Sequence, residues 1–287
     1  MARYAYVNGR YVDHREAMVH VEDRGYQLAD GVYEVVGVRD GRLIDEALHL
    51  DRLDRSLSEL RIAQPVPRAT LKFIIRELMR RNRLRDGLVY MQVTRGVARR
   101  DHAFPGTPVK PALVLTTKNS KRAEADAGPG IAVKSQPDIR WQRCDIKTVG
   151  LLANVLAKQA ARENGAYEAW LIDRQGNVTE GASTNAWIVT KGGELVTRAT
   201  DNGILAGITR HTLKSLAGDL QLKLVERPFS LAEAKAAQEA FITSATSFVT
   251  PVVRIDGDVV GDGKVGPVAR RLREEYVRFA AAGEAVT

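Results

Sequence analysis

The twenty residues from Arg140 to Gln159, RWQRCDIKTVGLLANVLAKQ, place a lysine just before a segment with helical periodicity. Apolar residues in 150–164 recur at helical spacing and predict a helix that packs inward through Leu151, Leu152, Val155 and Leu156. The dipole at the start of such a helix and desolvation both favour a neutral amine at Lys147. A neutral lysine is a nucleophile that forms a Schiff base with a carbonyl group. The alternative is an ordinary surface lysine, which is the commoner case for this residue type.

The bulk composition is that of a globular protein with room for two domains. The chain has 287 residues, of which 44% are hydrophobic and 27% are charged. A net charge of +8 raises nucleic acid as a partner, but 35 acidic residues are interleaved with the 43 basic ones. The densest basic run, RELMRRNRLR at residues 76–85, lies in a predicted amphipathic helix, where a solvated face explains it. A basic nucleic-acid-binding protein is the rival interpretation from another class.

Several features indicate a cytoplasmic protein. No segment has the roughly 18 uninterrupted apolar residues that a membrane span needs. The N-terminus, MARYAYVNGRYVDHRE, lacks the apolar core and cleavage site of a signal peptide. The single cysteine, Cys144, cannot form an internal disulfide, fits a reducing compartment and is interpreted as a small packing residue. The five histidines are scattered, so we expect no metal site.

The order of patterns predicts an α+β fold with two domains. Asn8-Gly9 and Asp40-Gly41 each join two strand-like runs and predict hairpins, and two helical patterns follow at about residues 46–62 and 68–83. A long loop, residues 95–110, contains RGVARRDHAFPGTP and is a candidate for binding chemistry. Residues 118–130 lose apolar periodicity and indicate a linker. We therefore expect domains at residues 1–120 and 121–287.

One nucleotide-binding pattern is rejected. GDGKVG at residues 261–266 has the spacing of a dinucleotide fingerprint, but the chain ends at Thr287, too soon for the helix, strand and acidic residue that must follow. The segment instead predicts the start of the last helix, with Pro267 in its first turn.

Three polar segments contain the groups that a lysine-bound pyridoxal phosphate would need. Glu180, in NVTEGASTN, can face a pyridine nitrogen, or it can be an exposed turn residue. The run GITR, Gly207 to Arg210, opens a predicted helix, so its backbone N–H groups and Thr209 can hold a phosphate or simply cap the helix. The run TSATS, residues 243–247, offers further hydroxyls, as does any small polar turn.

Eight stretches in order resemble the class IV (fold type IV) pyridoxal phosphate aminotransferases, and within them the bacterial enzymes that act on D-amino acids. They extend over nearly the whole chain: EDRGYQLADGVYEVV, HLDRLDRSL, VTRGVARRDHAFP, IRWQRCDIKTVGLLANVLAKQ, VTEGASTN, GILAGITR, TSATSFVTPV and IDGDVVGDGKVG. The resemblance implies a homodimer of two α/β domains with the cofactor at the domain interface. It also implies active sites shared between the subunits.

The resemblance also implies a role for each matching residue. Lys147 would form the internal aldimine and act as the catalytic base, and Glu180 would keep the pyridine nitrogen protonated. Tyr33, Arg100 and His102 would bind the substrate α-carboxylate, with the Arg-x-His pair supplied by the partner subunit. The remaining cofactor contacts would be Arg52, Ser183, Leu205, Gly207, Ile208, Thr209, Ser244, Ala245 and Thr246. Ala245 stands where many relatives have a hydroxyl, so backbone N–H groups and Thr246 would carry part of the phosphate binding. At Ala182 the run GASTN lacks a serine hydroxyl of the usual family pattern.

The implied reaction is ping-pong transamination between a D-amino acid, such as D-alanine, and a 2-oxo acid, such as 2-oxoglutarate. Alternatives within the same fold are a branched-chain L-amino acid aminotransferase, an R-selective amine transaminase and aminodeoxychorismate lyase. They share the cofactor residues, so Lys147 and Glu180 do not separate them. The run RRDH, residues 99–102, favours the D-selective enzymes because an arginine and a histidine two apart suit a carboxylate trap.

Overall fold

The computed structural model describes residues 3–120 and 126–282, which form two compact units. Unit 1 comprises Met1–Arg122, Ile146–Gly150 and Ala281–Thr287, and unit 2 comprises Ala123–Asp145 and Leu151–Ala280. Residues 121–125 of the expected linker lie outside the described residues. We expected the segment with Lys147 in the C-terminal domain. It belongs to unit 1 instead, because residues 147–149 pair with the start of a strand of that unit.

Unit 1 contains a six-stranded antiparallel sheet in the order β2-β1-β6-β5-β3-β4. The hairpin predicted at Asn8-Gly9 is confirmed: Val7 pairs with Arg10, and both turn residues have positive φ. The shorter hairpin at Asp40-Gly41 is confirmed as well. The strands are β1 Tyr4–Val7, β2 Arg10–Asp13, β3 Gly31–Arg39, β4 Arg42–Leu43, β5 Gly87–Thr94 and β6 Ala112–Asn119.

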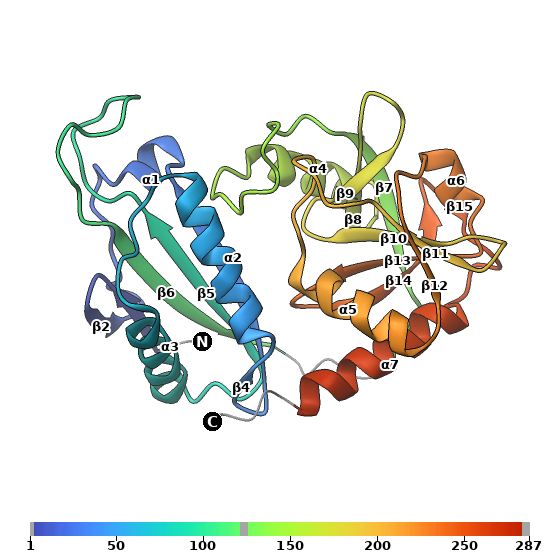
Figure 1. Ribbon diagram of the computed structural model, residues 1–287, viewed down its shortest axis with the longest axis horizontal. Coiled ribbons are helices and arrows are strands. Elements are labelled where there is room, and N and C mark those ends of the chain that lie inside the picture. Colours follow the sequence, from blue (N-terminus) through green and yellow to red (C-terminus); the bar gives the residue numbers. More distant parts are fainter. Residues whose placement is uncertain (1–2, 121–125, 283–287) are drawn as a thin grey trace. The chain divides into compact units, whose positions relative to one another are not determined.

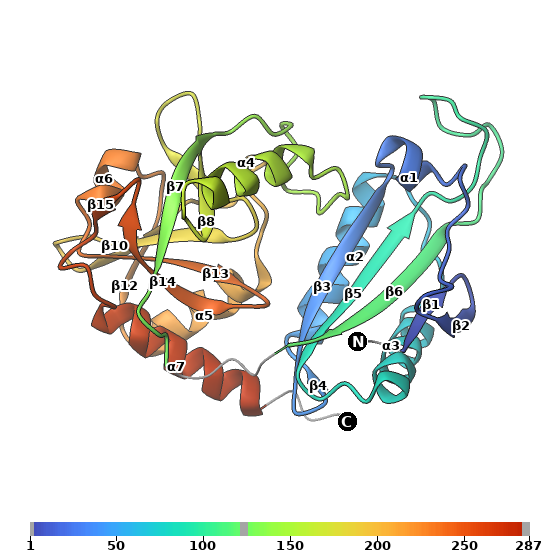
Figure 2. The same ribbon diagram turned by 180° about the vertical axis from the view of Figure 1, so that it is seen from behind.

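Two helices, α2 (Glu46–Glu59) and α3 (Arg68–Asn82), cover one face of this sheet. Seen from behind in Figure 2, strands β3, β5 and β6 lie in front of α2. The predicted helical patterns are confirmed, since every third or fourth side chain is buried against the strands, as at Leu50, Leu53 and Leu57. A short helix, α1 (Arg24–Leu28), precedes β3.

Unit 2 contains a nine-stranded mixed sheet in the order β12-β11-β10-β13-β14-β7-β8-β9, with β15 paired to β14. The pairs β11–β12, β14–β7 and β7–β8 are parallel and the others are antiparallel. The strands are β7 Ile131–Pro137, β8 Glu168–Ile172, β9 Val178–Gly181, β10 Asn185–Val189, β11 Glu194–Thr197, β12 Lys223–Glu226, β13 Glu239–Ser244, β14 Phe248–Ile255 and β15 Asp258–Val259.

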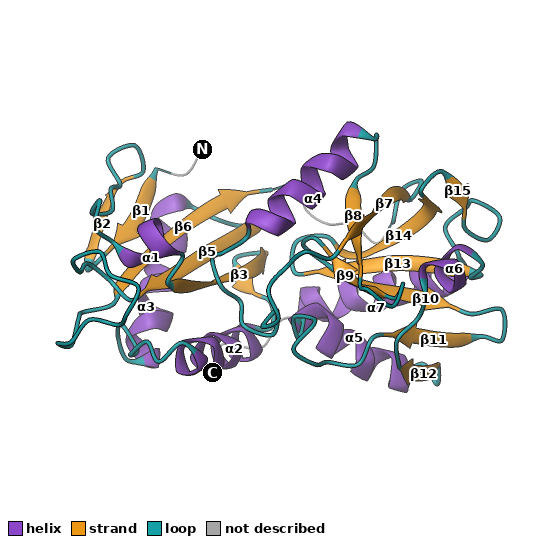
Figure 3. Ribbon diagram, turned by 90° about the horizontal axis from the view of Figure 1, so that it is seen from above, coloured by secondary structure: helices purple, strands orange, loops and turns teal. Residues whose placement is uncertain are grey.

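The long helices of unit 2 lie on opposite sides of its strands, with α4 on one side and α5 and α7 on the other (Figure 3). The helices are α4 Leu152–Glu163, α5 Ile208–Asp219, α6 Leu231–Lys235 and α7 Pro267–Ala282. Helix α7 begins at Pro267, which confirms the helix start that was predicted in place of a dinucleotide fingerprint. Within residues 3–120 and 126–282, no helix combines the length and apolarity needed to cross a membrane.

The predicted packing of α4 is wrong. Leu152, Val155 and Leu156 are 73%, 59% and 54% exposed in the single chain. The helix contacts β7 and β8 through small side chains, Ala157 and Ala161, which permit close approach of its backbone. Apolar periodicity therefore identified the helix correctly but assigned its buried face to the wrong residues.

Candidate functional site

Lys147 lies in an extended segment beside the start of β3. The Tyr33 N–H donates to the Lys147 carbonyl over 2.9 Å, and the Val149 N–H donates to the Gly31 carbonyl over 3.1 Å. The Nζ atom of Lys147 lies 4.1 Å from the centroid of the Tyr33 ring, within the range of a cation–π contact. Unit 1 thus brings together the predicted Schiff-base lysine and a predicted substrate-binding residue.

The predicted effect of a helix dipole on Lys147 is absent. Helix α4 begins at Leu152 with Leu151 as its N-cap, so Lys147 lies outside the first turn, to which the dipole effect is confined. The position of the amine is set instead by strand-like backbone pairing and by the aromatic face of Tyr33.

A second cluster in unit 1 surrounds Glu34, a residue that sequence reasoning missed. Glu34 is fully buried on β3, next to Tyr33. Arg52 donates through Nε and Nη2 to its two carboxylate oxygens, over 2.7 and 2.9 Å, and His49 Nδ1 lies 2.8 Å from the same group. Arg52, predicted to bind the cofactor phosphate, is therefore oriented by a buried carboxylate. The sequence signal that could have identified Glu34 is a charged residue inside the apolar run VYEVV.

The protonation states in this cluster follow from burial and charge. Burial raises the pKa of Glu34, but the charge and hydrogen bonds of Arg52, with His49, outweigh it and lower the pKa to about 2. Burial lowers the pKa of His49 below its ordinary value, so the imidazole is neutral near pH 7. An ionised carboxylate can only accept, so the proton of this neutral ring lies on Nδ1 and is donated to Glu34.

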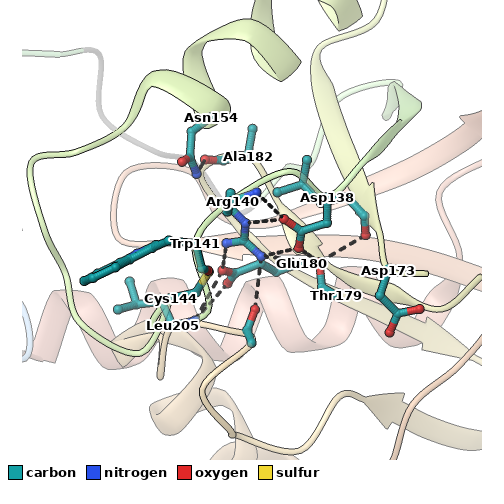
Figure 4. A network of polar contacts seen from close by, with 12 residues as sticks. Asp138, Arg140, Trp141, Cys144, Asn154, Asp173, Thr179, Glu180, Ala182 and Leu205 are labelled. Carbon is teal, nitrogen blue, oxygen red and sulfur yellow. Dashed lines mark hydrogen bonds and ion pairs between the residues drawn. The ribbon is translucent and has the colours of Figure 1, made fainter. Parts of the chain in front are cut away.

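In unit 2 a polar network holds Glu180 (Figure 4). Glu180 lies on β9 and is 5% exposed, which excludes the alternative of an exposed turn residue. Arg140 forms an ion pair with it, the Asn185 amide donates to it over 3.0 Å, and the Leu205 N–H donates over 3.2 Å. Asn185 also donates to the Leu205 carbonyl over 3.0 Å. The carboxylate predicted to face the pyridine nitrogen is thus linked to the predicted ring contact, Leu205.

Arg140 keeps this network ionised. Its Nη2 donates to Asp138 over 2.7 Å and to the Gly203 carbonyl over 3.0 Å, while Nη1 binds Glu180. Burial lowers the pKa of Arg140, but the hydrogen bond with Asp138 and the charges of Glu180 and Asp138 outweigh it and raise the pKa. Burial likewise raises the pKa of Asp138, and Arg140 outweighs it and lowers the pKa. Sequence reasoning missed both residues, although they occur in the stretch DIRWQRCDIK.

The predicted phosphate-binding helix is α5. Gly207 is its N-cap, and Ile208 and Thr209 form its buried first turn. A side chain at position 207 would collide with Asn185, because an added Cβ would lie 1.9 Å from Asn185 Oδ1. The helix start and the Glu180 network are therefore packed together, which is consistent with one cofactor contacting both.

Three other predicted contacts of unit 2, Ser183, Ser244 and Thr246, have hydroxyl groups with protein partners. Ser244 Oγ lies 3.2 Å from Thr246 Oγ1 and 2.8 Å from Ser247 Oγ in the turn that contains Ala245, between β13 and β14. Ser183 donates to Glu168 over 2.7 Å. The role of each toward a cofactor stays a prediction.

Arg100 and His102 are exposed on the loop between β5 and β6. Within the described part of the chain, no polar contact joins either of them to Tyr33. The structure therefore brings Tyr33 and Lys147 together and leaves the Arg-x-His pair apart from them.

Cys144 is not a candidate nucleophile. Its Sγ donates to the Trp141 carbonyl over 3.1 Å. Burial raises the pKa of the thiol to about 11, so it is protonated near neutral pH. Among the described residues, no group of three or more His, Cys, Asp or Glu side chains is arranged to hold a metal ion.

The comparisons with known proteins agree on one family. The family model for amino-transferase class IV matches residues 31–255. D-alanine aminotransferase of Staphylococcus haemolyticus is 42% identical over 274 residues, which cover 96% of each chain.

Two solved structures show the same fold. Branched-chain amino acid aminotransferase of Escherichia coli has a TM-score of 0.89 at 24% identity, covering 100% of this chain and 97% of that one. The branched-chain aminotransferase of Thermoproteus uzoniensis, solved with norvaline, has a TM-score of 0.84 at 26% identity, covering 98% and 96%. The family model and the 42% identical relative show that the chain belongs to the class IV aminotransferases.

Proposed function

We propose that this chain transfers the amino group between a D-amino acid, with D-alanine as the reference substrate, and a 2-oxo acid such as 2-oxoglutarate. The observation that carries the proposal is the 42% identity, over 96% of both chains, to a D-alanine aminotransferase. The branched-chain enzymes among the structural neighbours are 24% and 26% identical. The likeness to the 24% identical enzyme supports the fold and not its substrate.

The cofactor of the reaction is pyridoxal 5′-phosphate, and the residues present fit it. Glu180 is buried beside Arg140, so an ionised carboxylate is available to accept a hydrogen bond from a protonated ring nitrogen. The N-terminus of α5, with Gly207, Ile208 and Thr209, offers backbone N–H groups to a phosphate. When bound, the cofactor supplies an electron-withdrawing ring that stabilises negative charge at the substrate Cα.

The chain's own residues then have separate tasks. Lys147 would hold the cofactor through its side-chain amine, and this amine would also be the base that takes the proton from the substrate Cα. Tyr33, under Lys147 Nζ, holds that amine and contacts the substrate carboxylate. Arg52, oriented by Glu34, is the phosphate-binding arginine. Arg100 and His102 bind the α-carboxylate.

The first experiment is a visible spectrum followed by a rate comparison. We expect the purified protein to be yellow, to turn over D-alanine with 2-oxoglutarate far faster than L-leucine, and to lose colour and activity in Lys147→Ala. Lys191→Ala, an exposed turn lysine, is the matched control and should keep both. A colourless protein with salt-sensitive nucleic-acid binding would support the rival class. Equal or faster turnover of L-leucine would exclude D-selectivity.

We also propose a cytoplasmic homodimer in which each subunit supplies Arg100 and His102 to its partner. The exposed apolar side chains of α4 are consistent with a covered face. Mixing Lys147→Ala with Arg100→Ala subunits distinguishes the arrangements. Sites shared across the dimer would restore about a quarter of wild-type activity, because half the dimers are mixed and each has one intact site. Sites built within one subunit would restore none.

A further inference from the structure

Arg24, a residue of α1, holds the loop that contains Arg100 and His102 through a hydrogen bond to its backbone. The Arg24 guanidinium donates through Nη1 to the carbonyl of Asp101 over 2.6 Å. Asp101 is the residue between Arg100 and His102. Arg24 is 2% exposed, so a buried cation holds the backbone at the centre of this exposed pair.

Arg24 is itself held by a carboxylate. Its Nε donates to Asp30 Oδ2 over 2.7 Å, and Arg95 donates to both oxygens of the same carboxylate over 2.7 and 2.9 Å. Burial raises the pKa of Asp30, but hydrogen bonds and charge from Arg95 and Arg24 outweigh it and lower the pKa. Asp30 immediately precedes β3, the strand that carries Tyr33. The same carboxylate therefore ties the loop to the strand of the other predicted carboxylate-binding residue.

The loop is fixed on the far side of His102 as well. The Arg95 guanidinium lies 3.8 Å from the centroid of the Phe104 ring, and Arg61 lies 4.7 Å from it. The Asp101 side chain accepts from the Ala103 N–H over 3.1 Å, which closes a turn around His102. His102 thus lies in a short turn that is held at both ends by arginines bound to Asp30. Arg24 contacts the turn at Asp101, and Arg95 contacts it at Phe104.

The root of the loop pairs with the residues that lead into α1. The Arg24 N–H donates to the Gly96 carbonyl over 2.9 Å, and the Ala98 N–H donates to the Glu22 carbonyl over 3.3 Å. Within EDRGYQLADG, Arg24 therefore contacts the loop directly, and Asp30 holds both Arg24 and Arg95.

We propose that Arg24, supported by Asp30, is a positioning residue for the substrate α-carboxylate: it sets the backbone between Arg100 and His102 so that both side chains direct N–H donors at one carboxylate group. The inference rests on the proposed function. Arg24 does not touch substrate. It acts through Asp101, for whichever active site of a dimer the loop serves.

The test compares steady-state constants for Arg24→Lys and Arg24→Met with those of wild type. Lysine retains the charge but has a single ammonium group in place of the fork that reaches Asp30 and Asp101 together. We expect the KM for D-alanine and for 2-oxoglutarate to rise about tenfold or more in Arg24→Met, the effect of losing one charge-assisted hydrogen bond, and less in Arg24→Lys. The kcat and the cofactor absorbance should change little, because uniform substrate binding is what is lost.

Arg76→Met is the control for removing an arginine that pairs bidentately with a carboxylate of the same unit, here Glu46, and should leave both KM values unchanged. An unchanged KM in folded Arg24→Met would overturn the proposal, and so would a parallel loss of kcat, cofactor and Tm, which indicates a structural role alone. If Arg24→Met does not fold, Arg24→Lys and Asp30→Asn are judged by the same criteria. Failure of the proposed function appears separately, as a wild type inactive toward D-alanine; the variants are then compared on the amino acid it accepts.

Discussion

Each unit buries a glutamate beside an arginine, but the two clusters are built from different parts of the fold. In unit 1, Glu34 receives its hydrogen bonds from His49 and Arg52, which lie one turn apart on α2. Strand β3 and helix α2 already pack together through the core, so the donors are fixed by regular structure.

In unit 2, two of the donors to Glu180 come from loops. Arg140 lies in the loop between β7 and α4, and Leu205 lies in the loop just before α5. The third donor, Asn185, is on β10. Arg140 is in turn held by Asp138 on its own loop. From this difference we expect separate tasks: the Glu34 cluster would stabilise the unit and orient Arg52, whereas Glu180, in its predicted role, would present a charge to the cofactor.

The largest expected effect would come from Glu180→Gln. The amide keeps the shape of the side chain but removes its charge, so a bound ring nitrogen would lose the partner that keeps it protonated. We expect kcat to fall by about 100-fold or more, the loss typical of removing one electrostatic contact to a developing charge. The free energy of unfolding should change little, because Arg140 keeps Asp138 as a partner. Activity is measured at saturating cofactor, and a kcat near that of wild type would contradict the assigned role.

For Glu34→Leu we expect the main effect to be on stability and not on kcat. Removing the carboxylate takes a buried ion-pair partner away from Arg52, and we expect the free energy of unfolding to fall by about 3–5 kcal/mol. Denaturant unfolding of the cofactor-free protein measures this change, with Glu46→Gln as the control. Arg76, the partner of Glu46, is 41% exposed, so losing that pair should cost about 1 kcal/mol or less. Equal losses in the two variants would mean that Glu34 does not compensate a buried charge.

The sequence predicts the elements of unit 1 well, because local rules determine them. The turn at Asn8-Gly9 and the apolar spacing of α2 and α3 act over a few residues. The face of α4 was not predictable in this way. Periodicity shows that a helix has an apolar side, but small residues such as Ala157 and Ala161 compete for the contact with the sheet.

In the candidate site, too, the sequence predicts some residues and misses the partners that are distant in sequence. The matching stretches identify Lys147 and Glu180, and pairing with β3 then explains the position of Lys147 without any helix dipole. The partners of Glu180 were not predicted, because Arg140 reaches it across 40 residues of sequence through a loop. Arg24 was missed for the same reason, since its contact with Asp101 spans 77 residues.

The smallest expected effect concerns the pH dependence of stability in unit 1. Burial lowers the pKa of His49 in the folded state below its ordinary value of 6.5, so the unfolded chain binds a proton there more readily. Stability is therefore fully present above pH 6.5 and falls as the pH is lowered toward the folded pKa, with a slope of at most about 1.4 kcal/mol per pH unit. Glu34 continues the loss at lower pH, between its ordinary value of 4.5 and its folded value of about 2.

The variant His49→Gln separates these two contributions. Glutamine can still donate a hydrogen bond to Glu34 but does not titrate, so we expect the slope just below pH 6.5 to decrease while the slope below pH 4.5 remains. Denaturant unfolding of the cofactor-free protein at a series of pH values measures both slopes. His211→Gln, which replaces an exposed histidine on α5, should leave the profile of the wild type. An unchanged slope in His49→Gln would mean that His49 is protonated in the fold, and that the donor to Glu34 is an imidazolium paired with it as a full ion pair.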